Sequence, residues 1–275
     1  MDLSKLKSRV LISVTLIAFL WFGIFNLPSW VFLLVIVALV GRGLYEFFDM
    51  VARKNILVYR YFGIVIGCLI PVFMYLQFEP TEGTEFMLMT AVCLAVFILQ
   101  FRRRKTEQAL VGIATTVFGI FYISWLFSFM IKLRFMPPHG FDGRFLVLYL
   151  LLVTKSGDIA AYFIGTYFGK HQLIPRISPK KSVEGTVGGL IASFLAAVIF
   201  RGFLPSVNIT HIFILGFLLS ILSQIGDLSE SLIKRDCKVK DSGTFFPGLG
   251  GMLDLIDSLL FTTPIFYFYL RLLPV

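Results

Sequence analysis

Nine apolar segments, each long enough to cross a lipid bilayer as a helix, account for most of this sequence of 275 residues. A transmembrane helix needs roughly 17–25 predominantly apolar residues. Lipid offers no hydrogen-bond partner to an open backbone, so such segments are expected to be helical. The predicted spans are residues 10–27, 30–48, 61–78, 85–101, 109–131, 145–168, 185–204, 208–226 and 252–272. The sequence therefore predicts an all-α polytopic membrane protein with about nine transmembrane helices.

The composition agrees with this class. Hydrophobic residues make up 57% of the chain and charged residues only 15%, whereas a soluble domain carries about 25% charged residues. No polar stretch is long enough to form a separate soluble domain. We divide the chain into residues 1–140, with about five spans, and residues 141–275, which hold the other spans and two polar, basic loops at 169–184 and 227–251.

The lysines and arginines indicate how these spans are oriented. Nine spans place the two termini on opposite sides, and cytoplasmic loops are enriched in Lys and Arg. With the N-terminus in the cytoplasm, 18 of the 25 basic residues fall in cytoplasmic segments. Because the net charge of +9 follows this topology, it does not indicate a nucleic-acid partner. The sequence predicts a cytoplasmic N-terminus, a C-terminus on the opposite side, and both polar loops in the cytoplasm.

Four carboxylates lie where apolar segments border the second polar loop: Asp227, Glu230, Asp254 and Asp257. A charge at mid-bilayer costs about 2.5–3.5 kcal/mol on insertion scales, so such residues usually have a function. Asp227 and Glu230 are spaced i, i+3, and so are Asp254 and Asp257. This spacing puts the two members of each pair on one helix face. Carboxylate oxygens suit Mg²⁺, which also takes phosphate oxygens. Helix capping is an alternative for Asp254, but it does not explain Asp257, one turn further into an apolar helix.

The loop between these carboxylates combines cations with flexible backbone. Lys234, Arg235 and Lys240 can neutralise phosphate charge. Gly250 and Gly251 let backbone N–H groups approach an anion closely. By itself this pattern is a weak signal, because basic cytoplasmic loops are common.

The sixth span and the loop after it add further polar residues. Lys155 and Asp158, spaced i, i+3, either form an ion pair that lowers the cost of insertion or belong to a site inside the helix bundle. Pro175 and Pro179 predict an ordered turn in the following loop rather than a helix. The phosphate-binding candidates in this loop are Ser178, Lys180, Lys181 and Ser182.

The second span holds another pair of opposite charges, Arg42 and Glu46. Residues four apart lie on the same helix face, so we interpret this pair as a structural ion pair. The three histidines are scattered along the chain, and no histidine metal site is expected.

Together these residues make the C-terminal half similar to a known family. The stretch from Ser231 to Asp257 resembles the signature of phosphatidate cytidylyltransferases, also called CDP-diacylglycerol synthases. The similarity is strong over residues 150–260 and rests mainly on hydropathy over residues 1–140. Leu249 and Leu255 depart from the signature, which usually has His and Arg there. The matching residues are Gly226, Asp227, Leu228, Glu230, Ser231, Lys234, Arg235, Lys240, Asp241, Gly243, Pro247, Gly250, Gly251, Asp254 and Asp257, with Asp158, Ala161, Tyr162, Gly169, Lys170, Ser178, Pro179, Lys180, Lys181, Ser182, Glu184 and Gly185 upstream.

The resemblance implies transfer of CMP from CTP to phosphatidate, giving CDP-diacylglycerol and pyrophosphate. It implies Mg²⁺ held by Asp227, Asp254 and Asp257, and it allows a second, monovalent cation. These three carboxylates and Lys234 would form the catalytic centre. The substrate-binding residues would be Arg235, Lys240, Asp241, Ser178, Lys180, Lys181, Ser182, Asp158, Gly250 and Gly251. The expected location is the bacterial inner membrane, with the active site facing the cytoplasm.

Two other functions stay open on the sequence. The charged pair inside the sixth span is also compatible with an ion-coupled transporter, although no repeated half is visible. A further alternative is a lipid-phosphate transferase or kinase that uses another nucleotide or a polyprenyl acceptor. The expected partners are CTP, phosphatidate and the lipid bilayer, with no nucleic acid. A homodimer is compatible with the pattern without being required by it.

Overall fold

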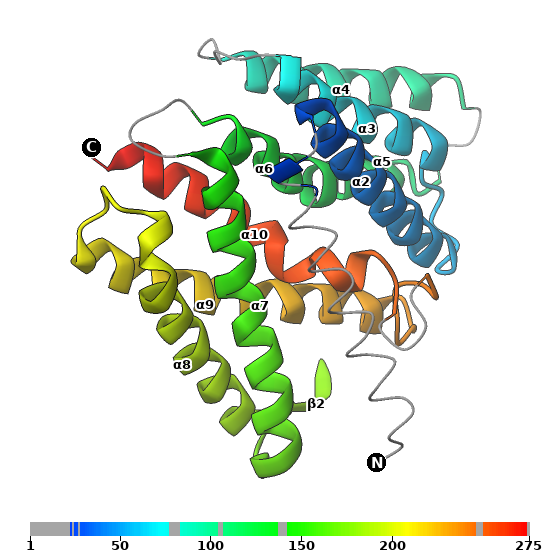
Figure 1. Ribbon diagram of the computed structural model, residues 1–275. Coiled ribbons are helices and arrows are strands. Elements are labelled where there is room, and N and C mark those ends of the chain that lie inside the picture. The colour runs from blue at the N-terminus through cyan, green and yellow to red at the C-terminus, as the bar shows by residue number, and fades with distance from the viewer. Residues whose placement is uncertain are drawn as a thin grey trace.

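The computed structural model describes residues 23, 25–26, 28–76, 83–103, 107–136, 142–245 and 250–273. Most of these residues are helical (Figure 1). The only strands in these ranges form one short antiparallel hairpin. The elements are α2 (Ser29–Ala52), α3 (Arg60–Leu76), α4 (Thr84–Phe101), α5 (Ala109–Gly119), the π-helix η1 (Ile120–Trp125), α6 (Leu126–Arg134), α7 (Gly143–Phe168), β1 (Gln172–Ile174), β2 (Ser178–Ser182), α8 (Val183–Ile199), the 3₁₀-helix η2 (Phe200–Phe203), α9 (Ile209–Asp236) and α10 (Leu253–Leu272).

The structure confirms an all-α polytopic membrane protein. Every predicted span from residue 30 onward overlaps a helix, while the first, 10–27, lies almost entirely outside the described residues. The segments within the described ranges that are long and apolar enough to cross a membrane are Ser29–Ala52, Ala109–Arg134, Gly143–Phe168, Val183–Phe203, Ile209–Asp236 and Leu253–Leu272. Two further apolar helices, Arg60–Leu76 and Phe86–Phe101, are shorter than these.

Helix α9 continues past residue 226, where the predicted span ends, to Asp236. In its last turns Glu230 and Lys234 are buried, and Lys234 pairs with Asp254 of α10. The first polar loop contains the β1–β2 hairpin, in which Gln172 pairs with Ser182 and Ile174 with Ser178.

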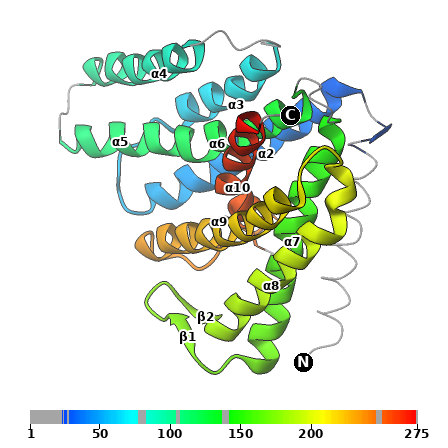
Figure 2. The ribbon, with the colours of Figure 1, turned by 90° about the vertical axis from the view of Figure 1, so that its left-hand side faces the viewer.

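Helices α9 and α10 run through the middle of the molecule. They pack side by side, with α7 and α8 on one side of them and α2 to α6 on the other (Figures 1 and 2). Helix α10 contacts α2, α6, α7 and α9, so both halves of the chain meet on it. Large side chains from α2, α6, α7 and α10, such as Phe47, Phe127, Tyr149 and Phe266, form one continuous buried core. The polar residues of α9 and α10 are therefore placed between the two halves.

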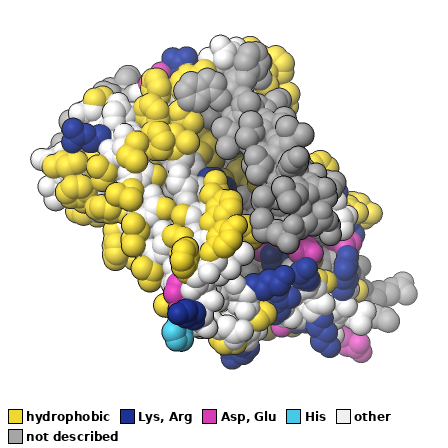
Figure 3. Space-filling model, turned by 60° about the horizontal axis from the view of Figure 1, so that its bottom comes forward, with side chains coloured by type: hydrophobic (Ala, Val, Ile, Leu, Met, Phe, Trp, Pro, Cys, Tyr) yellow, Lys and Arg dark blue, Asp and Glu magenta, His cyan; other side chains and the backbone are white. Residues whose placement is uncertain are grey.

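The surface separates apolar from basic side chains. Figure 3 shows hydrophobic side chains over much of one face, with Lys and Arg side chains gathered towards its lower right part. Exposed apolar side chains on several helices, among them Leu94, Phe97, Ile191 and Phe217, match a surface that contacts lipid. Lys54 follows α2, and its Nζ lies 2.6 Å from Oδ2 of Asp236 at the end of α9. The C-terminal ends of these two helices are therefore next to each other.

Candidate active site

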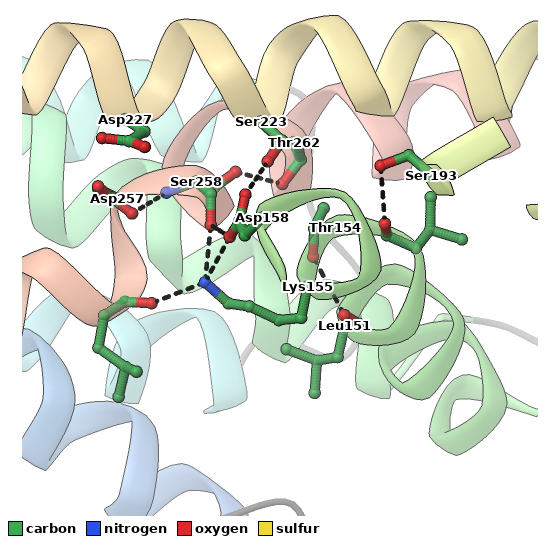
Figure 4. Close-up of polar contacts among 12 residues, drawn as sticks. Leu151, Thr154, Lys155, Asp158, Ser193, Ser223, Asp227, Asp257, Ser258 and Thr262 are labelled. Carbon is green, nitrogen blue, oxygen red and sulfur yellow. Dashed lines mark hydrogen bonds and ion pairs between the residues drawn. The ribbon is translucent and has the colours of Figure 1, made fainter. Parts of the chain in front are cut away.

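The candidate site lies where α9 and α10 cross closely. A side chain at Gly226 would bring its Cβ within 2.4 Å of the backbone oxygen of Asp257, so only glycine permits this approach. The contact brings the carboxylates of Asp227 and Asp257 face to face (Figure 4). Asp257 is only 6% exposed, whereas Asp227 lies at the rim of the buried region. Two acidic side chains from separate helices therefore lie close together.

The hairpin supplies a cation to this pair. Lys181, at the end of β2, places its Nζ atom 2.7 Å from Oδ2 of Asp227. Arg235 holds the hairpin against α9, because its Nε donates to the backbone oxygen of Ile177 at 3.1 Å. Its Nη1 also donates to the oxygen of Val239 at 3.2 Å. Arg235, predicted as a phosphate ligand, thus also orders the loops that carry the cations.

A second cluster of charges lies beside the first. Lys234 forms ion pairs with Glu230, one turn earlier on α9, and with Asp254 on α10, whose Oδ1 lies 2.5 Å from Nζ. Oδ2 of Asp254 accepts hydrogen bonds from the backbone N–H of Gly251 at 2.6 Å and from the N–H and hydroxyl of Ser242 at 3.1 and 2.8 Å. Protein donors therefore satisfy both oxygens of Asp254.

Gly250 is required by the same arrangement. Its φ of +98° lies in the left-handed region that favours glycine. A Cβ at this position would also come within 2.5 Å of Oδ2 of Asp254. The glycines of the signature thus serve the geometry of Asp254, in addition to any role in approaching an anion.

The residues present fit a magnesium ion through two of the three predicted ligands. Among the described residues, no three His, Cys, Asp or Glu side chains gather closely enough to hold a metal. Asp227 and Asp257 face each other, and Mg²⁺ is often held by one or two carboxylates together with substrate phosphates. Asp254 instead pairs with Lys234, Ser242 and Gly251. A metal role for all three carboxylates stays a prediction.

Asp158 belongs to a network that joins three helices (Figure 4). Its Oδ1 accepts from the hydroxyl of Ser223 on α9 at 2.9 Å, and its Oδ2 accepts from the hydroxyl of Ser258 on α10 at 2.9 Å. Lys155 lies 3.0 Å from the same Oδ2 and also donates to the backbone oxygen of Leu255 at 3.1 Å. The ion pair considered from the sequence is present, and it ties α7 to the helices of the site. Substrate binding by Asp158 remains a prediction.

The other predicted site residues lie around this centre. Ser182 caps α8 by accepting from the N–H of Gly185 at 3.1 Å. Ser178 lies in β2, and Lys180 is exposed on the same strand. Lys240 and Asp241 are exposed on the loop after α9. Leu249, one of the two departures from the signature, lies outside the described residues.

The sequence analysis missed two residues of the N-terminal half that contact α10, Glu46 and Tyr122. Glu46 forms the expected ion pair with Arg42, in which Nε of Arg42 lies 3.0 Å from Oε1 of Glu46. Glu46 also contacts the hydroxyl of Ser242 in the loop before α10. Tyr122, in the π-helix, is 3% exposed, and its hydroxyl has no hydrogen-bond partner within the described ranges. Its ring packs against that of Phe261 on α10, with the two centroids 5.9 Å apart. In the sequence, Glu46 stands out as an acidic residue inside an apolar span. Tyr122 has no comparable signal.

Comparison with known proteins agrees with the resemblance of the signature. The sequence model of the cytidylyltransferase family matches residues 7–273. A phosphatidate cytidylyltransferase of Synechocystis sp. is 33% identical, over 97% of this chain and 97% of its own length. One from Haemophilus influenzae is 32% identical, over 96% of this chain and 98% of its own length. An uncharacterised protein of Escherichia coli is 40% identical, over 58% of this chain but only 52% of its own length.

Proposed function

Because the chain belongs to the cytidylyltransferase family, we propose that it is a phosphatidate cytidylyltransferase, which joins CTP and phosphatidate into CDP-diacylglycerol and pyrophosphate. The observation that carries the proposal is the facing pair of Asp227 and Asp257. Two cations accompany it, Lys181 paired with Asp227 and Lys234 paired with Asp254. Relatives with that name match nearly the whole chain, so both halves are included in the comparison.

The chemistry requires two anionic reactants to meet. A phosphate oxygen of the lipid attacks the α-phosphorus of CTP, and the bond to pyrophosphate breaks. Charge neutralisation and alignment therefore dominate the barrier. Lys181 and Lys234, held by Asp227 and Asp254, are positioned to meet phosphate oxygens as fixed cations. Their carboxylate partners keep these amines in place between turnovers.

A divalent cation, proposed here as Mg²⁺, would be held by Asp227 and Asp257. When bound, it would neutralise phosphate charge and stabilise the leaving pyrophosphate. Asp254 orients Lys234 in this proposal, because both its oxygens already accept from protein donors. Asp257 is buried and Asp227 lies at the rim, so the pair can meet a ligand that enters from the outer edge of the site.

We also propose that the site faces the cytoplasm of a bacterial inner membrane. The loops around it carry Lys181, Lys234 and Lys240, in agreement with the enrichment of basic residues on the cytoplasmic side. CTP is a cytoplasmic solute, and phosphatidate is a component of the bilayer. A site at the ends of membrane helices lets the lipid enter sideways while the nucleotide enters from water.

The test is a transfer assay on the purified full-length protein in detergent. With CTP, phosphatidate and Mg²⁺, the protein is expected to release pyrophosphate and form CDP-diacylglycerol, detected by mass spectrometry. Asp257→Asn is expected to abolish both products while the protein still folds. Asp49→Asn serves as the control, because Asp49 pairs with Arg53 and Arg60. Normal turnover by Asp257→Asn would refute the assigned centre.

Substrate substitutions separate the remaining alternatives. Product from ATP or dCTP, or with a different lipid phosphate in place of phosphatidate, would identify a related transferase. Uptake of a solute into proteoliposomes that depends on Asp158 and needs no nucleotide would indicate a transporter. Removal of divalent cations with EDTA, followed by their return, tests the proposed Mg²⁺ dependence.

A further inference from the structure

Glu46 on α2 reaches across the molecule to the start of α10. Its Oε2 accepts from the backbone N–H of Leu253 at 3.0 Å and lies 3.1 Å from the hydroxyl oxygen of Ser242. Its Oε1 accepts from Nε of Arg42 at 3.0 Å. The side chain is 2% exposed, and it lies 196 and 207 residues along the chain from Ser242 and Leu253. A carboxylate buried in this way is costly unless its oxygens are well satisfied.

The contact supplies the cap that α10 does not have of its own. The first N–H groups of a helix have no partner within the helix. Met252, the residue before α10, makes no side-chain capping bond within the described part of the chain. Glu46 accepts one of these N–H groups, at Leu253, and so caps the helix from another element. A negative charge at this end of α10 is also favourable for the helix dipole.

Two glycines of the loop make room for Glu46. A Cβ on Gly243 would lie 2.6 Å from its Oε1, and a Cβ on Gly251 would lie 2.3 Å from its Oε2. Both glycines belong to the loop between α9 and α10, and Gly251 also donates to Asp254. The loop is thus shaped to accept a carboxylate from the N-terminal half.

The same loop atoms position the Lys234–Asp254 pair. The hydroxyl of Ser242 lies between the carboxylates of Glu46 and Asp254, and its single proton can serve one of them at a time. The backbone N–H of Ser242 and that of Gly251 both donate to Asp254. A movement of Glu46 would therefore shift the donors that orient Asp254.

We infer that Glu46 is a positioning residue of the active site: it holds Ser242 and the first turn of α10 so that Asp254 keeps Lys234 aimed at the reacting phosphates. The role of Glu46 in catalysis rests on the proposed function, whereas its contacts with Ser242 and Leu253 do not. The N-terminal helices then have a part in the reaction beyond anchoring the protein in the membrane.

The experiment compares Glu46→Gln with Asp49→Asn in the full-length protein. Asp49 lies on the same helix and forms ion pairs only with Arg53 and Arg60 among the described residues, so it is a matched loss of one carboxylate. Two readouts are taken: kcat with KM for CTP, and hydrogen–deuterium exchange of peptides covering residues 240–256. Glu46→Gln is expected to lower kcat by roughly 10–100-fold and to speed exchange in these peptides, with little change in Asp49→Asn.

Each outcome has a distinct meaning. Unchanged kcat in Glu46→Gln overturns the inference, whether or not exchange changes. Faster exchange with a loss of kcat supports it. If the unaltered protein transfers no cytidylyl group, the proposed function fails, while the exchange measurement still tests whether Glu46 holds the loop.

A second pair of variants covers the case in which Glu46→Gln does not fold. Gly243→Ala places a methyl group against Oε1 of Glu46 from the loop side, and Ser242→Ala removes one of its donors. Both are expected to lower kcat and to speed exchange over residues 240–256. Normal kcat in both variants overturns the inference.

Discussion

Gly226 on α9 lies directly against the backbone oxygen of Asp257 on α10, so closely that a Cβ at residue 226 would come within 2.4 Å of it. The next residue on α9 is Asp227, and its carboxylate faces that of Asp257 (Figure 4). The separation of the two helices at this point therefore sets the separation of the two carboxylates.

Replacing Gly226 by alanine is expected to damage both stability and activity. The added methyl group meets backbone rather than a flexible side chain, so one helix must move. Overpacking of this kind costs about 1–3 kcal/mol. Thermal unfolding in detergent and the transfer assay measure the two effects. Gly202→Ala is the control, because a Cβ at Gly202 meets no described atom within 4 Å, and equal behaviour of the two variants would contradict the prediction.

Lys181 is expected to matter more than its neighbour Lys180. Lys181 pairs with Asp227 at 2.7 Å, whereas Lys180 is exposed on the same strand. Lys181→Met keeps most of the side-chain stem and removes the charge, so kcat/KM for CTP should fall by roughly 100–1,000-fold. Lys180→Met should have a smaller effect. Steady-state kinetics on the two variants decide the matter, and a larger loss at Lys180 would show that the wrong cation was assigned.

Tyr122 and Tyr149 form a matched pair for a stability test. Both are buried, at 3% and 0% exposure, but only Tyr149 has an acceptor, the backbone oxygen of Ala197 at 3.4 Å. The hydroxyl of Tyr122 has none in the described part of the chain. An unsatisfied buried polar group costs about 1–3 kcal/mol, so Tyr122→Phe should raise Tm while Tyr149→Phe lowers it. Loss of stability in Tyr122→Phe would reveal a partner for the hydroxyl.

Asp142, which caps α7 outside the spans, predicts a local pH dependence. Side-chain hydrogen bonds from Arg144, including one of 2.8 Å, hold the pKa of Asp142 below its usual range. A depressed pKa stabilises the fold above the unfolded pKa, near 3.9, and this contribution disappears as the pH falls through the folded value. The difference in Tm between the unaltered protein and Asp142→Asn should thus be constant near neutral pH and shrink below about pH 4. A difference that stays constant down to pH 2 would argue against this ion pair.

The sequence determined the class of this protein because lipid leaves a long apolar segment few alternatives to a helix. It also placed Asp227, Glu230 and Lys234 on one face, since helical spacing depends only on residue number. The predicted span ended at residue 226 because hydropathy does not detect a polar helix end; α9 continues to Asp236, and there Lys234 pairs with Asp254 of α10.

Only the tertiary structure decided which charges meet. Asp254 and Asp257 are one turn apart on α10, yet one pairs with Lys234 and the other faces Asp227. Glu46 joins the site from α2 through contacts that nothing in its own neighbourhood predicts. These pairings follow from helix packing, set by close contacts such as that of Gly226 with Asp257. Such contacts depend on atoms distant in sequence, whereas the spans depend on the local run of side chains alone.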